Sequence, residues 1–217
     1  ALLMEYLPRA YKNGAADPEA REKVHYAATI AGMAFANAFL GICHSLAHKL
    51  GATFNIPHGL ANALMISHVI RYNATDMPFK QAIFPQYEYP HAKERYAKIA
   101  DALHLGGSTP DEKVELLILA VENLKRKIEI PLTIQEVIPE REAEFYGKVM
   151  ELAVQAFDDQ CTGANPRYPL IEDLKELYLL AYRGSSIETP VFFPHNGNGN
   201  TPSNALQEET QLVGAAK

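Results

Sequence analysis

The sequence is poor in the residues that mark several classes of protein. Its two cysteines, Cys43 and Cys161, are too few for a disulfide scaffold or for a zinc module built from cysteine alone. No run of 18 apolar residues occurs, so the sequence predicts no transmembrane helix, and no secretory signal is visible at its start. The net charge of −6 offers no basic surface for nucleic acid. We therefore expect neither nucleic acid nor a membrane as a partner.

Glycine-rich phosphate-binding motifs and internal repeats are also missing. A dinucleotide-binding fold shows G-x-G-x-x-G between a strand and a helix, where the backbone must approach the pyrophosphate. Neither that motif nor a P-loop occurs, so a nucleotide would have to be held largely by residues outside this chain. The chain opens in helical periodicity with neither a start methionine nor a capping residue, which predicts that it is part of something longer.

What the sequence does contain is a succession of helical patterns. Asp17 and Pro18 are typical of a helix start, as a cap followed by proline at the first helical position. The apolar stretch 27–39 predicts a helix that runs through 18–49 and is buried on most sides. Strand patterns are nearly absent, so the expected fold class is an all-α helical bundle. Further helices are expected over 1–13, 59–73, 91–104, 110–128, 140–157 and 169–183, with a short one from Pro131.

The helical pattern ends at Gly184, and a polar segment rich in asparagine and glycine follows. Such a composition is typical of a flexible tail. The sequence thus predicts an all-helical domain over 1–183 and a low-complexity tail over 184–217. Residues 74–90 contain three prolines and are interpreted as an irregular excursion.

Four of the eight histidines fall between positions 44 and 68. His44 and His48 are four residues apart and therefore share one helix face. Two zinc ligands have this spacing in H-E-x-x-H proteases, but serine follows His44, so the catalytic glutamate of that motif is missing. A zinc protease is disfavoured, and the spacing leaves both histidines equally good as ligands.

His58 lies 14 residues beyond His44, which is about 21 Å on a continuous helix and too far for one metal ion. Gly51 and Pro57 can turn the chain back between them. His58 would then begin the next helix and face the end of the previous one, as in a two-helix clasp on one metal. The alternative is a pair of core histidines. Because a catalytic metal usually has at least three protein ligands, others would have to come from elsewhere.

Three other features favour structural roles. Cys43 adjoins His44 but points to a different helix face, so a buried core thiol is expected. His68 is interpreted as a core or surface residue, and residues 165–167 as the loop that starts the last helix.

Residues 23–75 resemble the iron-containing (group III) alcohol dehydrogenases. Residues 157–167 narrow the resemblance to the alcohol dehydrogenase half of bifunctional aldehyde-alcohol dehydrogenases. In that family a nucleotide-binding α/β domain precedes an all-α domain, which is dehydroquinate synthase-like. The resemblance implies that this chain is the all-α, metal-binding part. The motifs are AATIAG at 27–32, CHSLAHKLG at 43–51, PHGLANA at 57–63 and FDDQCTGANPR at 157–167.

The resemblance also assigns site residues. The family holds one divalent metal, usually iron, with an Asp and a His from an earlier helix and two later histidines. The later pair corresponds to His44 and His58, whereas the first two ligands would lie before the first residue of this chain. His48 corresponds to a histidine near the reacting centre that is not a ligand, and it is the candidate catalytic residue and nucleotide contact. Phe35 and Cys161 correspond to residues that line the substrate pocket.

The implied activity is the interconversion of acetaldehyde and ethanol, or other primary alcohols, by reversible hydride transfer with NAD. Fe²⁺ is the implied metal, although imidazole ligands also suit Zn²⁺. We expect this chain alone to be inactive, and we expect the cytoplasm as its location, or an organelle in a eukaryote. One alternative is a helical assembly module, because bifunctional members form homo-oligomers and filaments. Another is a metal-dependent hydrolase or lyase.

Overall fold

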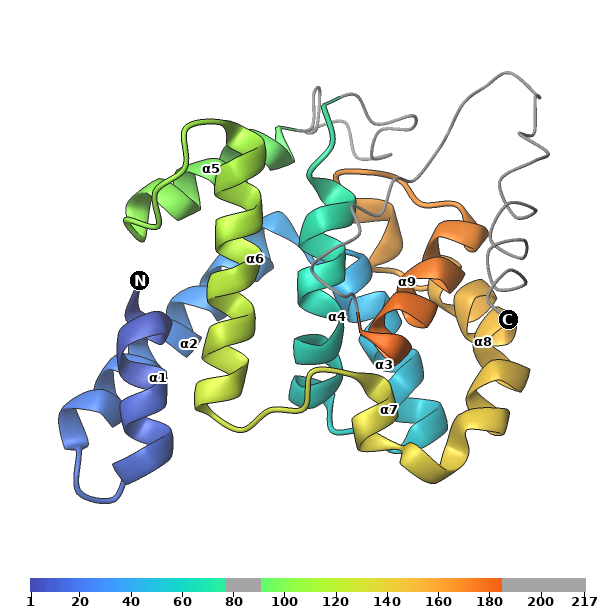
Figure 1. The fold of residues 1–217 in the computed structure, drawn as a ribbon, viewed down its shortest axis with the longest axis horizontal. Helices are drawn as coiled ribbons and strands as arrows, with labels where there is room; N and C mark the ends of the chain where they lie inside the picture. Colours follow the sequence, from blue (N-terminus) through green and yellow to red (C-terminus); the bar gives the residue numbers. More distant parts are fainter. Residues whose placement is uncertain (77–90, 185–217) are drawn as a thin grey trace, which may run out of the picture.

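The computed structural model describes residues 1–76 and 91–184 (Figure 1). The predicted tail beyond Gly184 and most of the predicted excursion lie outside the described residues. Within these ranges every regular element is a helix, which confirms the all-α prediction. The elements are α1 (Leu2–Asn13), α2 (Pro18–Ala38), α3 (Ile42–Phe54), α4 (His58–Asn73), α5 (Ala92–Ala102), α6 (Pro110–Lys127), α7 (Ile134–Val137), α8 (Glu142–Phe157) and α9 (Ile171–Arg183), with the 3-10 turns η1 (Pro139–Arg141) and η2 (Thr162–Ala164).

The main core lies between four helices that are distant in sequence. α3 packs against α4 and α8, and α9 packs against the same two helices. In Figure 1, α6 stands between α4 and α1 and passes in front of α2, and α5 packs against α6. This arrangement gives the histidine-bearing helices α3 and α4 a rigid support. Fully buried side chains in the main core include Leu46, Leu64, Phe145, Leu152 and Leu177.

The predicted single helix over 18–49 is wrong, because the chain breaks between Ala38 and Ile42. Phe39 has a positive φ of 62° and a ψ of −173°, which ends α2 even though phenylalanine is not a helix-breaking residue. The chain bends by 110° between α2 and α3. α3 then continues to Phe54, five residues beyond the predicted end. The sequence signal for such a break is weak, since Gly41 differs little from Gly32, which lies inside α2.

The expectation that α2 is buried on most sides is also wrong within the described residues. Ala20 is its one buried residue, and the small residues in its middle leave little side chain to cover. Its main neighbour is α1, which covers one side. No single described helix is long and apolar enough to cross a membrane, although the bent pair α2 and α3 passes that test by length and composition. Large apolar side chains that stay exposed are Tyr26, Ile30, Met33 and Phe35 on α2 and Phe39 at its end.

Candidate metal centre

Three histidines from two consecutive helices form a cluster. His44 and His48 lie one turn apart on α3, and His58 is the first residue of α4. The ring of His58 lies 5.2 Å from that of His44 and 5.4 Å from that of His48, between centroids. One ligand atom from each of the three residues lies within 4.8 Å of the others. The chain therefore turns back between His44 and His58, which the two-helix clasp requires.

The turn that brings the histidines together takes three residues after Phe54. Asn55 adopts a left-handed backbone with φ of 58°, which asparagine tolerates better than most residues, and its N–H caps α3 on Gly51 O. Pro57 then precedes the first residue of α4. A Cβ on Gly51 would lie 3.3 Å from Ile56 O, so a glycine here lets the returning chain approach α3.

The donor set fits a divalent transition metal. His44 Nδ1 is buried and has no hydrogen-bond partner among the described residues, which is uncommon for a buried polar atom. Burial, and then the neighbouring His58 and His48, lower the pKa of His44 and favour its neutral form. His58 Nε2 lies 3.2 Å from the Asn62 side-chain nitrogen, one turn further along α4. Neutral imidazoles with lone pairs are what iron or zinc requires.

Asp159, in the segment after α8, is a member of the site that sequence reasoning missed. Its Oδ2 lies 3.0 Å from His48 Nδ1 and 2.9 Å from Lys49 Nζ. Burial alone would raise the pKa of Asp159, but hydrogen bonds from Cys161 N, Lys49 and His48 outweigh it and hold the pKa well below its usual range. Asp159 lies 111 positions from His48 in the sequence, so no local pattern predicts their contact. The one signal in the sequence was the acidic pair Asp158 and Asp159 near Cys161.

Cys161 lies beside His48, whereas Phe35 lies near the end of α2. The Cys161 thiol is buried, and its sulfur belongs to a group with His48 and Asp159 whose ligand atoms lie within 4.8 Å of one another. Burial and the charge of Asp159 raise the pKa of this thiol to about 11. The ring of Phe35 is half-exposed, and its role in a substrate pocket stays a prediction.

Cys43 and His68 take structural positions, as expected. Cys43 packs against the main core, its Sγ lies 3.6 Å from Asn62 O, and burial raises its pKa to about 12. His68 is buried on α4, where burial and then Lys125 lower its pKa to about 4.

The loop over 165–167 does more than start a helix. Asn165 is buried, and its Oδ1 accepts from Ile42 N at 3.2 Å, at the start of α3. Its Nδ2 donates to Asn73 Oδ1 at 2.7 Å, at the end of α4. Arg167 donates to Tyr72 O at 3.0 Å and lies over the Tyr72 ring. This network ties together the two helices that carry the histidines, and nothing in the local sequence distinguishes it from a polar loop.

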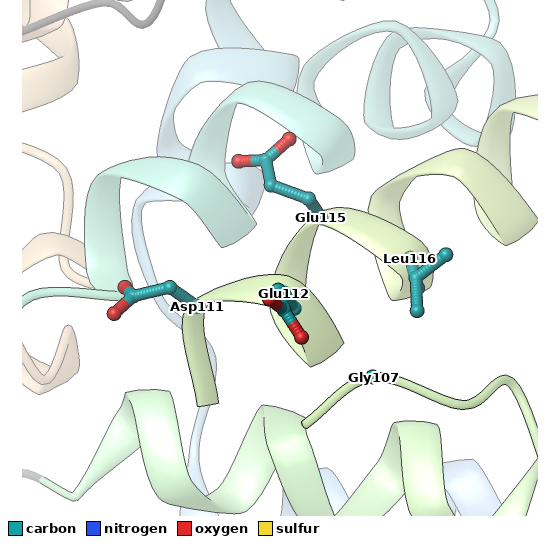
Figure 2. Close-up of a pocket in the computed structure, with 5 residues that line it drawn as sticks. All are labelled: Gly107, Asp111, Glu112, Glu115 and Leu116. Carbon is teal, nitrogen blue, oxygen red and sulfur yellow. The ribbon is translucent and has the colours of Figure 1, made fainter. Parts of the chain in front are cut away.

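A hollow at the start of α6 is separate from the cluster. Figure 2 shows its lining, where the side chains of Asp111, Glu112 and Glu115 leave α6 in different directions. Each carboxylate already has a partner: Asp111 pairs with Lys93 at 2.6 Å, Glu115 pairs with Arg71, and Glu112 accepts from the backbone of the α6 cap. These acids are therefore engaged in holding α6, and the hollow carries no histidine or cysteine.

Comparison with known proteins gives concordant matches. A model of the Fe-containing alcohol dehydrogenase family, C-terminal, matches residues 1–182. The bifunctional aldehyde-alcohol dehydrogenase AdhE of Escherichia coli (strain K12) is 58% identical over an alignment of 187 residues, which covers 84% of this chain and 21% of that protein. The NADPH-dependent butanol dehydrogenase of Clostridium saccharobutylicum is 41% identical over 86% of this chain and 43% of that protein.

Comparison with solved structures supports the same family fold. An iron-containing alcohol dehydrogenase from Thermococcus thioreducens matches with a TM-score of 0.64 and 36% identity, covering 85% of this chain and 44% of that one. The chain thus spans between about a fifth and less than half of the length of the proteins it matches.

Proposed function

Because the chain belongs to the iron-containing alcohol dehydrogenase family, we propose that it is the metal-binding helical part of an enzyme that interconverts primary alcohols and aldehydes with a nicotinamide dinucleotide. Ethanol and acetaldehyde are the proposed substrate pair, and NAD is the proposed cofactor. The observation that carries the proposal is the histidine cluster, in which His44 Nδ1 is buried without a partner among the described residues.

His44 and His58 are the residues we propose to hold the cation, Fe²⁺ first and Zn²⁺ as the alternative. A bound divalent cation supplies Lewis acidity, which favours the ionised form of an alcohol and polarises an aldehyde carbonyl. Two imidazoles are fewer than the three protein ligands usual at a catalytic metal, so further ligands are proposed to come from a preceding part of a longer chain.

His48 is proposed to act on the substrate or the nicotinamide rather than as a ligand. Its Nδ1 faces Asp159, which leaves Nε2 as the nitrogen that can accept or donate a proton at the reacting centre. Cys161 and Phe35 are proposed as walls of the substrate pocket. A buried, protonated thiol suits a wall, because it excludes water and does not compete as a nucleophile.

The exposed apolar face of α2 supports a function within a larger assembly. Ile30 and Met33 are more than half-exposed, and contiguous apolar surface of this kind commonly marks a contact with protein. We propose that the nucleotide-binding domain of a longer chain covers this face. Assembly into homo-oligomers or filaments, and a cytoplasmic location, stay predictions.

The proposal is tested by titrating the 217-residue chain with Zn²⁺ and with Fe²⁺ in calorimetry under anaerobic conditions. We expect one binding event, weakened at least about tenfold by His44→Ala and by His58→Ala. His25→Ala is the matched control, because His25 is exposed and outside the cluster. Binding that both cluster variants retain would overturn the metal assignment. NAD-dependent ethanol oxidation by a longer chain that contains these residues tests the reaction itself.

A further inference from the structure

We infer that Asp159 is a positioning residue that fixes the ring orientation and the tautomer of His48, an inference that rests on the proposed function. The carboxylate comes from the segment between α8 and η2, whereas His48 lies on α3. Asp159 contacts one member of the cluster, His48, but is not one of the three histidines that form it.

The Asp159 carboxylate is itself held from several directions. Its Oδ1 accepts from Cys161 N at 3.0 Å, and its Oδ2 accepts from Lys49 Nζ at 2.9 Å. Its side chain is 8% exposed, so it has little freedom to turn toward water. A carboxylate fixed in this way presents Oδ2 to His48 Nδ1 in one orientation.

The contact determines where the proton of a neutral His48 sits. An ionised carboxylate only accepts hydrogen bonds, so the His48 Nδ1 that lies 3.0 Å from it must carry the proton. Nε2 then holds the lone pair, and the imidazole face toward His58 is fixed by the same contact. Carboxylate–histidine pairs set the tautomer in this manner at metal and catalytic sites.

Lys49 provides the means to separate this role from a structural one. Its ammonium shares Oδ2 with His48, and the pair would by itself anchor α3 to the segment after α8. An anchor of that kind stabilises the fold but does not choose between the two tautomers of a histidine. The tautomer is therefore the property that distinguishes positioning from anchoring.

The experiment is long-range ¹H–¹⁵N NMR of the ¹⁵N-labelled chain at a pH where His48 is neutral, because the nitrogen shifts report which atom carries the proton. We expect the Nδ1–H tautomer to dominate in the wild-type chain, and Asp159→Ala to shift the population toward Nε2–H. Asp158→Ala is the matched control, since Asp158 is an exposed neighbour of the same chemistry. Lys49→Met removes the ion pair but leaves the acceptor, so the Nδ1–H tautomer should persist.

A wild-type chain in which His48 is mainly Nε2–H would overturn the inference without any variant, and so would an Asp159→Ala chain that keeps Nδ1–H. The cation titration depends on His44 and His58 instead. Its failure would count against the proposed function and leave the tautomer result standing, whereas a chain that binds cations normally with the wrong His48 tautomer would reject the inference alone.

Discussion

Gly41 and Asn165 approach so closely that a Cβ on Gly41 would lie 2.6 Å from Asn165 Oδ1. The same oxygen accepts from Ile42 N, so the start of α3 is fixed against the loop that follows α8. The contact holds the end of α3 nearest to His44, and a side chain at position 41 would have to displace Asn165 or the start of α3.

Gly41→Ala should therefore destabilise the chain. The added methyl must displace Asn165 or the start of α3, and overpacking of this kind costs about 1–3 kcal/mol. Chemical denaturation measures the change in the free energy of unfolding. Gly147→Ala is the control, because a Cβ at Gly147 meets nothing within 4 Å and alanine favours the interior of α8 by about 0.5–1 kcal/mol. Equal effects of the two substitutions would contradict the steric argument.

Tyr72→Phe should cost more than Tyr11→Phe, although both remove a hydroxyl that donates to a carboxylate. The Tyr72 hydroxyl lies 2.9 Å from Asp173 Oδ2 in the interior, so its loss removes a buried charged hydrogen bond worth about 1–3 kcal/mol. The Tyr11 hydroxyl donates to Glu129 in solvent, where a change within about 0.5 kcal/mol is expected. Urea unfolding of both variants gives the comparison, and a larger loss for Tyr11→Phe would contradict it.

His68 should make the chain less stable as the pH falls through the range from about 6.5 to about 4. Its pKa is lowered to about 4 by burial and by Lys125 and Arg71, against the opposite effect of Glu122. The unfolded chain therefore takes up the His68 proton first, and acidification favours unfolding. The difference between a pKa of 6.5 in the unfolded chain and about 4 in the folded chain corresponds to at most about 3.4 kcal/mol of stability, present above pH 6.5 and lost toward pH 4.

Urea unfolding at pH 7.5 and at pH 5 checks the His68 prediction. His68→Gln should remove most of this part of the pH dependence, while His25→Gln should leave it unchanged because His25 is exposed. A wild-type chain whose stability varies no more than that of His68→Gln between these pH values would refute the assignment.

Leu46→Ala and Ile30→Ala should separate the core from the exposed face of α2. Leu46 is fully buried in the main core, so its truncation should cost about 2–5 kcal/mol. Ile30 is 58% exposed, so its truncation should change the free energy of unfolding by less than about 0.5 kcal/mol. Thermal or urea unfolding of the chain tests both substitutions. A large loss in the free energy of unfolding for Ile30→Ala would contradict the exposure of this side chain.

Helical periodicity and turn residues predicted most elements of the fold to within a few residues. The start of α2 follows its signal directly, since Asp17 accepts from Ala20 N at 3.0 Å and Pro18 occupies the first helical position. The break at Phe39 was missed because phenylalanine has no preference for a positive φ, so the residue type does not mark the end of α2. The burial of α2 was misjudged because apolar composition says what a helix can bury, not which neighbours are present to cover it.

The site was predictable where its residues are close in sequence and unpredictable where they are not. Spacing and the turn residues placed His44 and His58 opposite each other, but spacing alone did not separate His44 from His48. Asp159 and Asn165 reach α3 from positions more than 100 residues away, and no local pattern predicts such a contact. A single sequence carries no record of which distant residues meet.

The three-residue turn between α3 and α4 has a consequence for the order of folding. His44 and His58 are separated by 14 positions, so the contact between them closes a short loop at little entropic cost. The contact between His48 and Asp159 spans 111 positions and closes only when α8 has docked. We therefore expect the imidazole cluster to assemble early in folding, with the carboxylate that orients His48 joining it among the last native contacts.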